Sequence, residues 1–149
     1  MREIKYRAWL KEEKRMVNVE DISLDYQQIS YKPFKEEDLE FQEHLKTIMP
    51  GKFQGCLSSS LFKEIELMQY TGLKDKNGVD IYEGDIIKIP SDYDEYGWNA
   101  GEKYEVIFKL GGFRLAPKYN SKANGYWLEN DGEFEVVGNI YENEDLIRG

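Results

Sequence analysis

Two residues of this sequence are of types that could do nucleophilic chemistry. His44 is the only histidine and Cys56 the only cysteine, so a thiol activated by a histidine would have to combine these two. His44 stands between charged side chains in a segment rich in helix formers, which is typical of a solvent-facing histidine. One histidine with scattered carboxylates also lacks the ligand spacing of a metal site. We therefore expect no catalytic residues, no metal and no cofactor.

A second candidate lies in the polar run of residues 69–90, QYTGLKDKNGVDIYEGDIIKIP, where Glu83 and Asp85 could form a carboxylate pair for acid–base catalysis. A turn carboxylate more often accepts hydrogen bonds from backbone N–H groups, and we favour that role here. The run lacks both glycine spacings that bind phosphate, and no helical pattern follows it, so a phosphate loop is excluded. An enzyme would need Glu83, Asp85 or His44 in a pocket with a perturbed pKa.

Two segments carry aromatic side chains among small polar residues, a composition typical of recognition loops. They are residues 91–104 and 118–127. Alternatively, these rings fold back and cover the ends of a small barrel. Acidic residues of the first segment favour a basic or neutral partner over nucleic acid. The candidate binding residues are Tyr93, Tyr96, Trp98, Tyr126 and Trp127.

The composition is that of a folded acidic protein. Of 149 residues, 40% are hydrophobic and 14% aromatic, which separates the chain from disordered chains of similar charge. The net charge of −9 disfavours binding to nucleic acid or anionic lipid. Four basic residues lie close together in the sequence, Lys109, Arg114, Lys118 and Lys122. Charged side chains at such a spacing are usually just solvated. With no signal-peptide pattern and no run long enough to span a membrane, we expect a cytoplasmic protein without a disulfide.

The candidate site residues depend for their positions mostly on predicted strands. Alternating apolar residues predict a strand over residues 3–10, a return strand over 15–20 and an extended piece over 22–31. Residues 35–48 have the spacing of a short amphipathic helix, and residues 50–60 are typical of a linker. The later strands are predicted at 62–70, 85–89, 103–108, 112–116, 126–129 and 134–140.

The turns between these strands are also marked in the sequence. Asn77-Gly78 predicts a chain reversal with type I′ geometry, and Gly84 predicts a turn into the strand that follows it. Residues 143–147 predict one closing helical turn. The fold class is therefore mainly β with a minor helical part, a small barrel or sandwich. We expect residues 1–60 to be an N-terminal hairpin and helical segment, and residues 61–149 to form the barrel.

Three blocks in order, residues 2–9 (REIKYRAW), 67–87 (LMQYTGLKDKNGVDIYEGDII) and 135–143 (EVVGNIYEN), resemble the YopX family. The resemblance implies a bacteriophage or prophage protein with an SH3-like barrel and additions, and with no assigned biochemical activity. It carries over no catalytic residue. Residues 31–60 and 91–102 match no motif of the family.

The leading hypothesis from the sequence is a non-enzymatic phage accessory protein that binds a protein partner or itself, as a homo-oligomer. One alternative is a nucleic-acid-binding protein of phage replication or regulation. Another is an acidic inhibitor of a host nucleic-acid-binding protein, which requires carboxylates spaced along one face.

Overall fold

The structure is a computed structural model that describes residues 3–32, 47, 57–90, 101–117, 125–128 and 133–148. These residues are mainly β, in two antiparallel sheets, which confirms the predicted class. The chain divides into two compact units, residues 7–67 and residues 1–6 with 68–149. Among the described residues, no helix has the length and apolar character needed to cross a membrane.

The unit of residues 7–67 is built on an antiparallel meander. Its strands are β1 (Tyr6–Leu10), β2 (Arg15–Ser23), β3 (Gln28–Tyr31) and β4 (Ser58–Leu61). The predicted alternation in the first strand is confirmed for Ala8 and Leu10, which are buried with the half-exposed Trp9 between them, whereas Ile4 precedes the strand and is 71% exposed. Ala8 and Leu10 pack with Val17, Ile29 and Ile65 in the core of this unit.

Two predictions in this unit are wrong. Residues 58–60 were expected in a linker, but Ser58–Leu61 pairs residue by residue with β3. Serine has no strong strand preference, so pairing with a formed neighbour decides the conformation here. The strand expected from Phe62 begins instead as a single turn of 3-10 helix, η2 (Phe62–Glu64), where the Glu64 carboxylate accepts from the Leu61 N–H at 3.0 Å.

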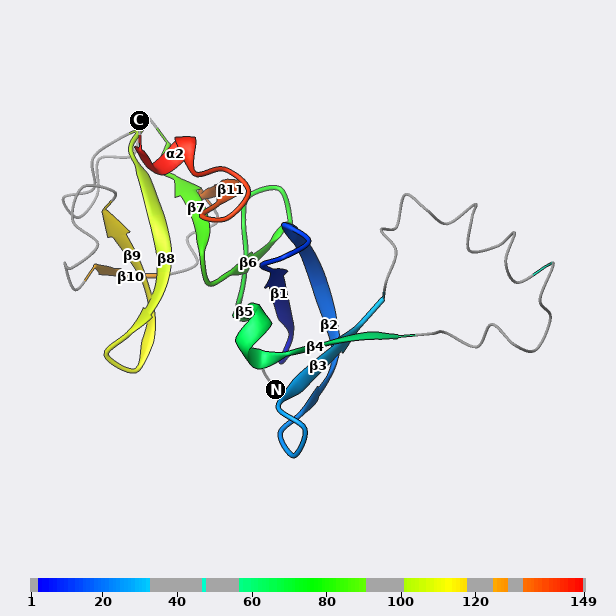
Figure 1. The fold of residues 1–149 in the computed structure, drawn as a ribbon. Coiled ribbons are helices and arrows are strands. Elements are labelled where there is room, and N and C mark those ends of the chain that lie inside the picture. The colour runs from blue at the N-terminus through cyan, green and yellow to red at the C-terminus, as the bar shows by residue number, and fades with distance from the viewer. Residues whose placement is uncertain are drawn as a thin grey trace. The chain divides into compact units, whose positions relative to one another are not determined.

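The other unit carries the later strands and a closing helical turn (Figure 1). Its elements are β5 (Ile65–Lys74), β6 (Asp80–Tyr82), β7 (Asp85–Lys88), β8 (Lys103–Lys109), β9 (Gly112–Pro117), β10 (Tyr126–Trp127), β11 (Glu135–Asn139) and α2 (Asp145–Arg148). Apart from the short β6, each had been predicted to within a few residues. The core of this unit is formed by Ile81, Ile87, Ile89, Tyr104, Val106, Leu115 and Phe134.

Both sheets are open within the described residues. One has the order β4-β3-β2-β1-β5-β6, with the division between the two units falling inside β1 and β5, and the other has the order β10-β9-β8-β7-β11. Each therefore has two edge strands, and neither closes into a barrel. The predicted helix of residues 35–48, apart from Thr47, lies outside the described part of the chain.

The reversal predicted at Asn77-Gly78 is confirmed, but its type I′ geometry is wrong. Gly78 has a φ of 82°, whereas Asn77 does not take a positive φ. The turn is instead organised by Asp75, whose carbonyl accepts from the Gly78 N–H at 3.0 Å. Because the Asp75 side chain also accepts from the Asn77 N–H, the backbone is held in a turn that needs only one left-handed residue.

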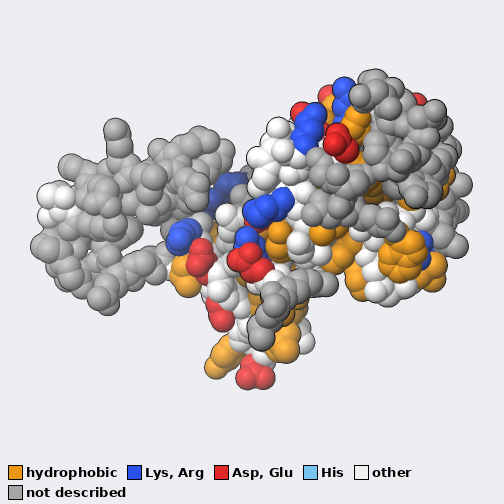
Figure 2. Space-filling view, turned by 180° about the vertical axis from the view of Figure 1, so that it is seen from behind, with side chains coloured by type: hydrophobic (Ala, Val, Ile, Leu, Met, Phe, Trp, Pro, Cys, Tyr) orange, Lys and Arg blue, Asp and Glu red, His pale blue; other side chains and the backbone are white. Residues whose placement is uncertain are grey.

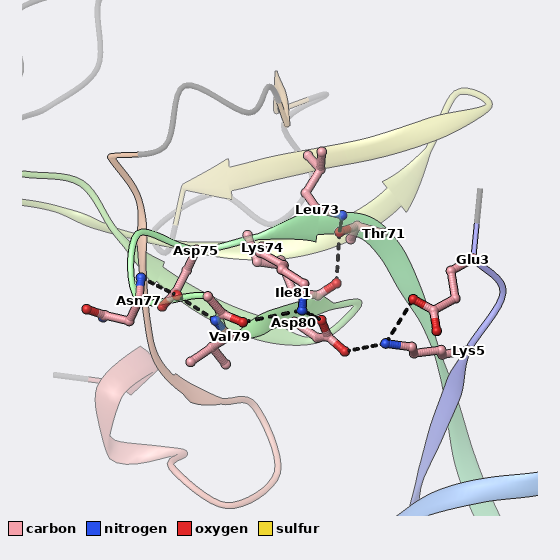
Figure 3. A network of polar contacts seen from close by, with 11 residues as sticks. Glu3, Lys5, Thr71, Leu73, Lys74, Asp75, Asn77, Val79, Asp80 and Ile81 are labelled. Carbon is pink, nitrogen blue, oxygen red and sulfur yellow. Dashed lines mark hydrogen bonds and ion pairs between the residues drawn. The ribbon is translucent and has the colours of Figure 1, made fainter. Parts of the chain in front are cut away.

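The buried Asp75 carboxylate reaches beyond its own turn (Figure 3). Oδ1 accepts from the Asn77 and Val79 N–H groups at 2.8 and 2.9 Å, and Oδ2 accepts from the Val136 N–H on β11 at 3.1 Å. Burial by itself would raise the pKa of Asp75, but these backbone donors outweigh it and lower the pKa below its usual range. The ionised carboxylate thus joins two segments that lie far apart in the sequence.

We expect Asp75→Ala to lower the free energy of unfolding by about 2–4 kcal/mol, since three N–H groups lose an ionised acceptor. Asp75→Asn should cost less, because its amide oxygen can still accept from two of them. The depressed pKa adds a pH signature: the stabilisation is present above the carboxyl's ordinary pKa and is lost as pH falls through the folded-state value. Urea unfolding between pH 7 and pH 3 measures both effects, and equal stability of Asp75→Ala and wild type at pH 7 would contradict this assignment.

Candidate functional site

The two carboxylates weighed as a catalytic pair in the polar run lie in different surroundings. Asp85 is only 1% exposed, and its Oδ2 accepts from the Tyr82 N–H at 2.7 Å. This is the turn-capping role that the sequence favoured. Glu83 stands in the turn itself, with its N–H donating to the Gln69 carbonyl at 3.0 Å. Gly84 completes the turn with a φ of 79°, as predicted.

A third carboxylate of the run, Asp80, is held by two lysines. Lys5 donates to its Oδ2 at 2.8 Å and Lys74 donates to its Oδ1, while Lys5 also pairs with Glu3 (Figure 3). Burial would raise the pKa of Asp80, but the hydrogen bonds from Lys5 and Lys74 lower it. Its oxygens are engaged in fixing β6 beside β5, so Asp80 is a structural ion pair.

The most unusual acidic side chain was missed from the sequence. Glu105 lies in the middle of β8, paired with the buried Ala116 on one side and the buried Ile86 on the other. Burial raises the pKa of Glu105, and the charge of Glu83 raises it further. The signal in the sequence was a single acid inside the apolar strand KYEVIFK. The charged neighbour that acts on Glu105 is thus another carboxylate, Glu83.

Metal and nucleophile chemistry find no support in the part of the chain that is described. There, no group of three or more His, Cys, Asp or Glu side chains could hold a metal ion. His44 and Cys56 lie outside the described residues, as do Tyr93, Tyr96 and Trp98. Of the sequence-predicted binding residues, the structure therefore places Tyr126 and Trp127.

Tyr126 and Trp127 together form the edge strand β10, and they point to opposite faces of the sheet. Tyr126 pairs with Leu115 and packs edge-on against Tyr104, with ring centroids 6.4 Å apart. Trp127 pairs with Arg114 and is 52% exposed. Tyr126 is thus partly a cover for the core, whereas Trp127 presents a large ring to solvent.

Trp127 is held in place although it is exposed. The Arg114 guanidinium lies 3.8 Å from the centroid of its ring and also donates to the carbonyls of Lys109 and Gly125, at 3.2 and 3.3 Å. On the strand beside it stands Gly112, where a Cβ would come within 2.3 Å of the ring. The ring therefore rests on backbone that only a glycine leaves open. Such fixing lowers the entropy that an aromatic contact loses on binding.

The β8–β9 hairpin next to it ends in exposed apolar side chains. Phe108 is 53% exposed and packs on Phe113 across the hairpin, with ring centroids 5.2 Å apart. The turn between Lys109 and Gly112 consists of Leu110 and Gly111, with φ of 55° and 79°. Positive φ at both positions is what a type I′ turn requires, but leucine is a poor residue for it. Leu110 is nevertheless 65% exposed, so no burial compensates for its conformation.

We call Phe108, Leu110, Phe113, Arg114 and Trp127 the hairpin-end surface. The hairpin extends beyond β10, and hydrophobic side chains gather at its end beside a basic one (Figures 1 and 2). By the register, the two phenylalanines share one face of the hairpin, and Arg114 and Trp127 share the other. The sequence did not reveal this surface, because Phe108 and Phe113 stand at alternating positions of their strands, as core residues do.

The comparisons with known proteins agree with each other. The family model described as YopX protein matches residues 5–148. A crystal structure of protein EF1440 from Enterococcus faecalis is similar at a TM-score of 0.56 and 25% identity, covering 99% of both chains. The crystal structure of protein yopX from Bacillus subtilis is similar at a TM-score of 0.54 and 21% identity, covering 98% of both chains. None of the curated proteins compared with the chain matches it.

We expect Leu110→Asn to raise the free energy of unfolding by about 1 kcal/mol, because asparagine tolerates the left-handed conformation that costs leucine about that much. Chemical denaturation checks this. Leu24→Asn serves as the control. Leu24 is a 77% exposed leucine in the turn between β2 and β3, and Leu24 itself has no positive φ. A loss of stability in Leu110→Asn would mean that the leucine makes contacts which outweigh its backbone conformation.

Glu105→Gln should stabilise the protein at pH 7 by roughly 0.5 kcal/mol, a small effect because solvent screens a half-buried carboxylate. The sign follows from the raised pKa: the folded state binds the proton more tightly, so stability is lost as pH rises from the ordinary carboxyl pKa through the folded-state value. The gain should therefore vanish near pH 4. Thermal unfolding from pH 4 to 7 measures it against Glu102→Gln, an exposed neighbour. A gain that does not change with pH would refute this origin.

Proposed function

The chain belongs to the YopX family, and we propose that it is a protein-binding module without enzymatic activity, with a second copy of itself as its first partner. The observation that carries the proposal is the hairpin-end surface. It presents Phe108 and Trp127 on opposite faces of the hairpin and Leu110 in its turn, each more than half exposed. Exposed apolar side chains grouped in this way are typical of interaction sites.

The residues of this surface have the properties of binding hot spots. Tryptophan and arginine are the residues most enriched at such positions, and Trp127 is held by Arg114 before any partner arrives. A ring that is already in place loses little freedom on binding, so more of its contact energy remains as affinity. The left-handed Leu110 supports the same conclusion, since backbone strain is concentrated at functional positions.

The absence of an enzymatic role is part of the proposal, and the motif carboxylates support it. Asp75 and Asp85 accept backbone hydrogen bonds, and Asp80 is paired with two lysines. These oxygens hold turns and strands in register. We further propose that the protein is an accessory protein of a bacteriophage or prophage, acting in the host cytoplasm. The finer architecture, an SH3-like barrel in residues 61–149, would be built around the sheet β10-β9-β8-β7-β11.

If a second copy is the partner, the double variant Phe108→Ser/Leu110→Asn should weaken self-association at least about tenfold, because it removes two exposed apolar groups from the contact. Sedimentation velocity over a range of protein concentrations measures the dissociation constant of wild type and variant. Leu110→Asn is included because it is expected to relieve backbone strain, which offsets what Phe108→Ser takes from packing.

The control is Leu24→Ser, which removes a leucine that is 77% exposed, against 65% for Leu110, from a hairpin turn of the other unit. It should associate like wild type. A wild-type chain that stays monomeric up to about 1 mM would exclude self-association of useful strength. An oligomer that the double variant forms equally well would remove the hairpin end from the interface.

A further inference from the structure

Charge is unevenly distributed between the hairpin region and the remainder of the chain. Residues 103–128, which span β8, β9 and β10, contain five basic side chains and one acidic one, a net charge of +4. All other residues together contain 15 basic and 28 acidic side chains, a net charge of −13. The segment that carries the exposed apolar side chains is therefore the positive part of an acidic protein.

We propose that the hairpin-end surface binds an acidic polypeptide segment that carries large apolar side chains. The inference rests on the proposed protein-binding function and specifies the chemistry of the partner. Phe108 on one face of the hairpin, Trp127 on the other and Leu110 in the turn between them supply the apolar contact, and Lys109 beside the turn attracts carboxylates. The acidic remainder of a second copy of this chain meets the charge requirement.

The two cations near the hairpin end, Lys109 and Arg114, have different roles. Lys109 directly precedes the turn, next to Leu110 in the chain, so its charge lies at the margin of the apolar end. Charges at the rim of an interface mainly increase the rate of association and select partners, while apolar groups at the centre supply affinity. Arg114 has the other role, because its guanidinium is bound to two carbonyls and stacked on Trp127.

Nucleic acid is the competing acidic ligand, and the geometry disfavours it. Nε and Nη1 of Arg114 already donate to the Lys109 and Gly125 carbonyls, so these two donors are not directed toward a phosphate. The two exposed rings, Phe108 and Trp127, lie on opposite faces of the hairpin, and Leu110 between them has no π-face, so they form no continuous platform on which successive bases could stack. The net charge of −13 on the other residues repels a phosphate backbone at long range.

A random peptide library displayed on phage and selected on the full-length chain tests the proposal while the partner is still unidentified. Three baits are used in parallel: wild type, Leu24→Ser, and Phe108→Ser/Leu110→Asn. Circular dichroism and thermal unfolding first establish that all three are folded. We expect peptides that are enriched on wild type and on Leu24→Ser but not on the double variant, with acidic residues in excess over basic ones around aromatic or aliphatic residues.

The possible results separate this inference from the function on which it rests. Hairpin-dependent peptides without an acidic excess would overturn the acidic-partner inference and leave the protein-binding function standing. A selection in which no peptide depends on the hairpin end would overturn both. If a fluorescent oligothymidylate, but no peptide, binds wild type and is lost in the double variant, the surface is a nucleic-acid site and the proposal is wrong.

Charge reversal then tests the role of Lys109 on one enriched peptide. Lys109→Glu should weaken its binding about tenfold at low salt, with a smaller difference at high salt, because the interaction is electrostatic. Lys88→Glu makes the same charge change at an exposed lysine on β7 and should have much less effect. Equal losses in the two variants would show that only net charge matters, which contradicts a contact at the hairpin end.

Discussion

The hydrogen bonds accepted by the Asp75 carboxylate are the constraint on which the later part of the chain depends. Asp75 lies in the turn between β5 and β6, and it accepts the N–H of Val136 on β11. Next to it, the Lys76 N–H donates to the Phe134 carbonyl at 2.9 Å. Two segments more than fifty residues apart are therefore joined by backbone groups that would otherwise be buried without partners. Phe134, whose carbonyl takes part in this junction, belongs to the hydrophobic core of this unit.

The blocks that carry the family resemblance are explained by the same kind of bond. Thr71 accepts from the Leu73 N–H and donates to the Ile81 carbonyl, which holds the irregular pairing of β5 with β6. In the last block, the Asn139 side-chain oxygen accepts from two N–H groups of the following turn. Polar residues whose types could suggest catalysis in the sequence are here hydrogen-bond acceptors in tight turns. Their hydrogen bonds give these motif positions a structural role.

Alternation and turn chemistry predicted most strands of this protein from the sequence, and they failed where a contact decides the outcome. Ser58–Leu61 becomes a strand because β3 offers it a partner, and serine residues carry no periodic signal of that. The loss of water around Glu105 depends on which strands lie beside β8, which sequence order does not reveal. Trp127 was predicted as a binding residue, but its support by Gly112 and Arg114 depends on the register of β9 with β10.

Three residues other than glycine take a left-handed backbone in hairpin turns, Lys14, Gln27 and Leu110, and Leu110 is the apolar one among them. At Gly78 and Gly84 a left-handed backbone is taken by glycine, so local preference and fold agree. At Leu110 they disagree, and the side chain gains no burial in exchange. A sequence optimised for folding alone would place asparagine or glycine there. An exposed leucine kept at that position makes sense if its burial occurs in a complex, where an apolar side chain at the outermost point of the hairpin is the first to meet the partner.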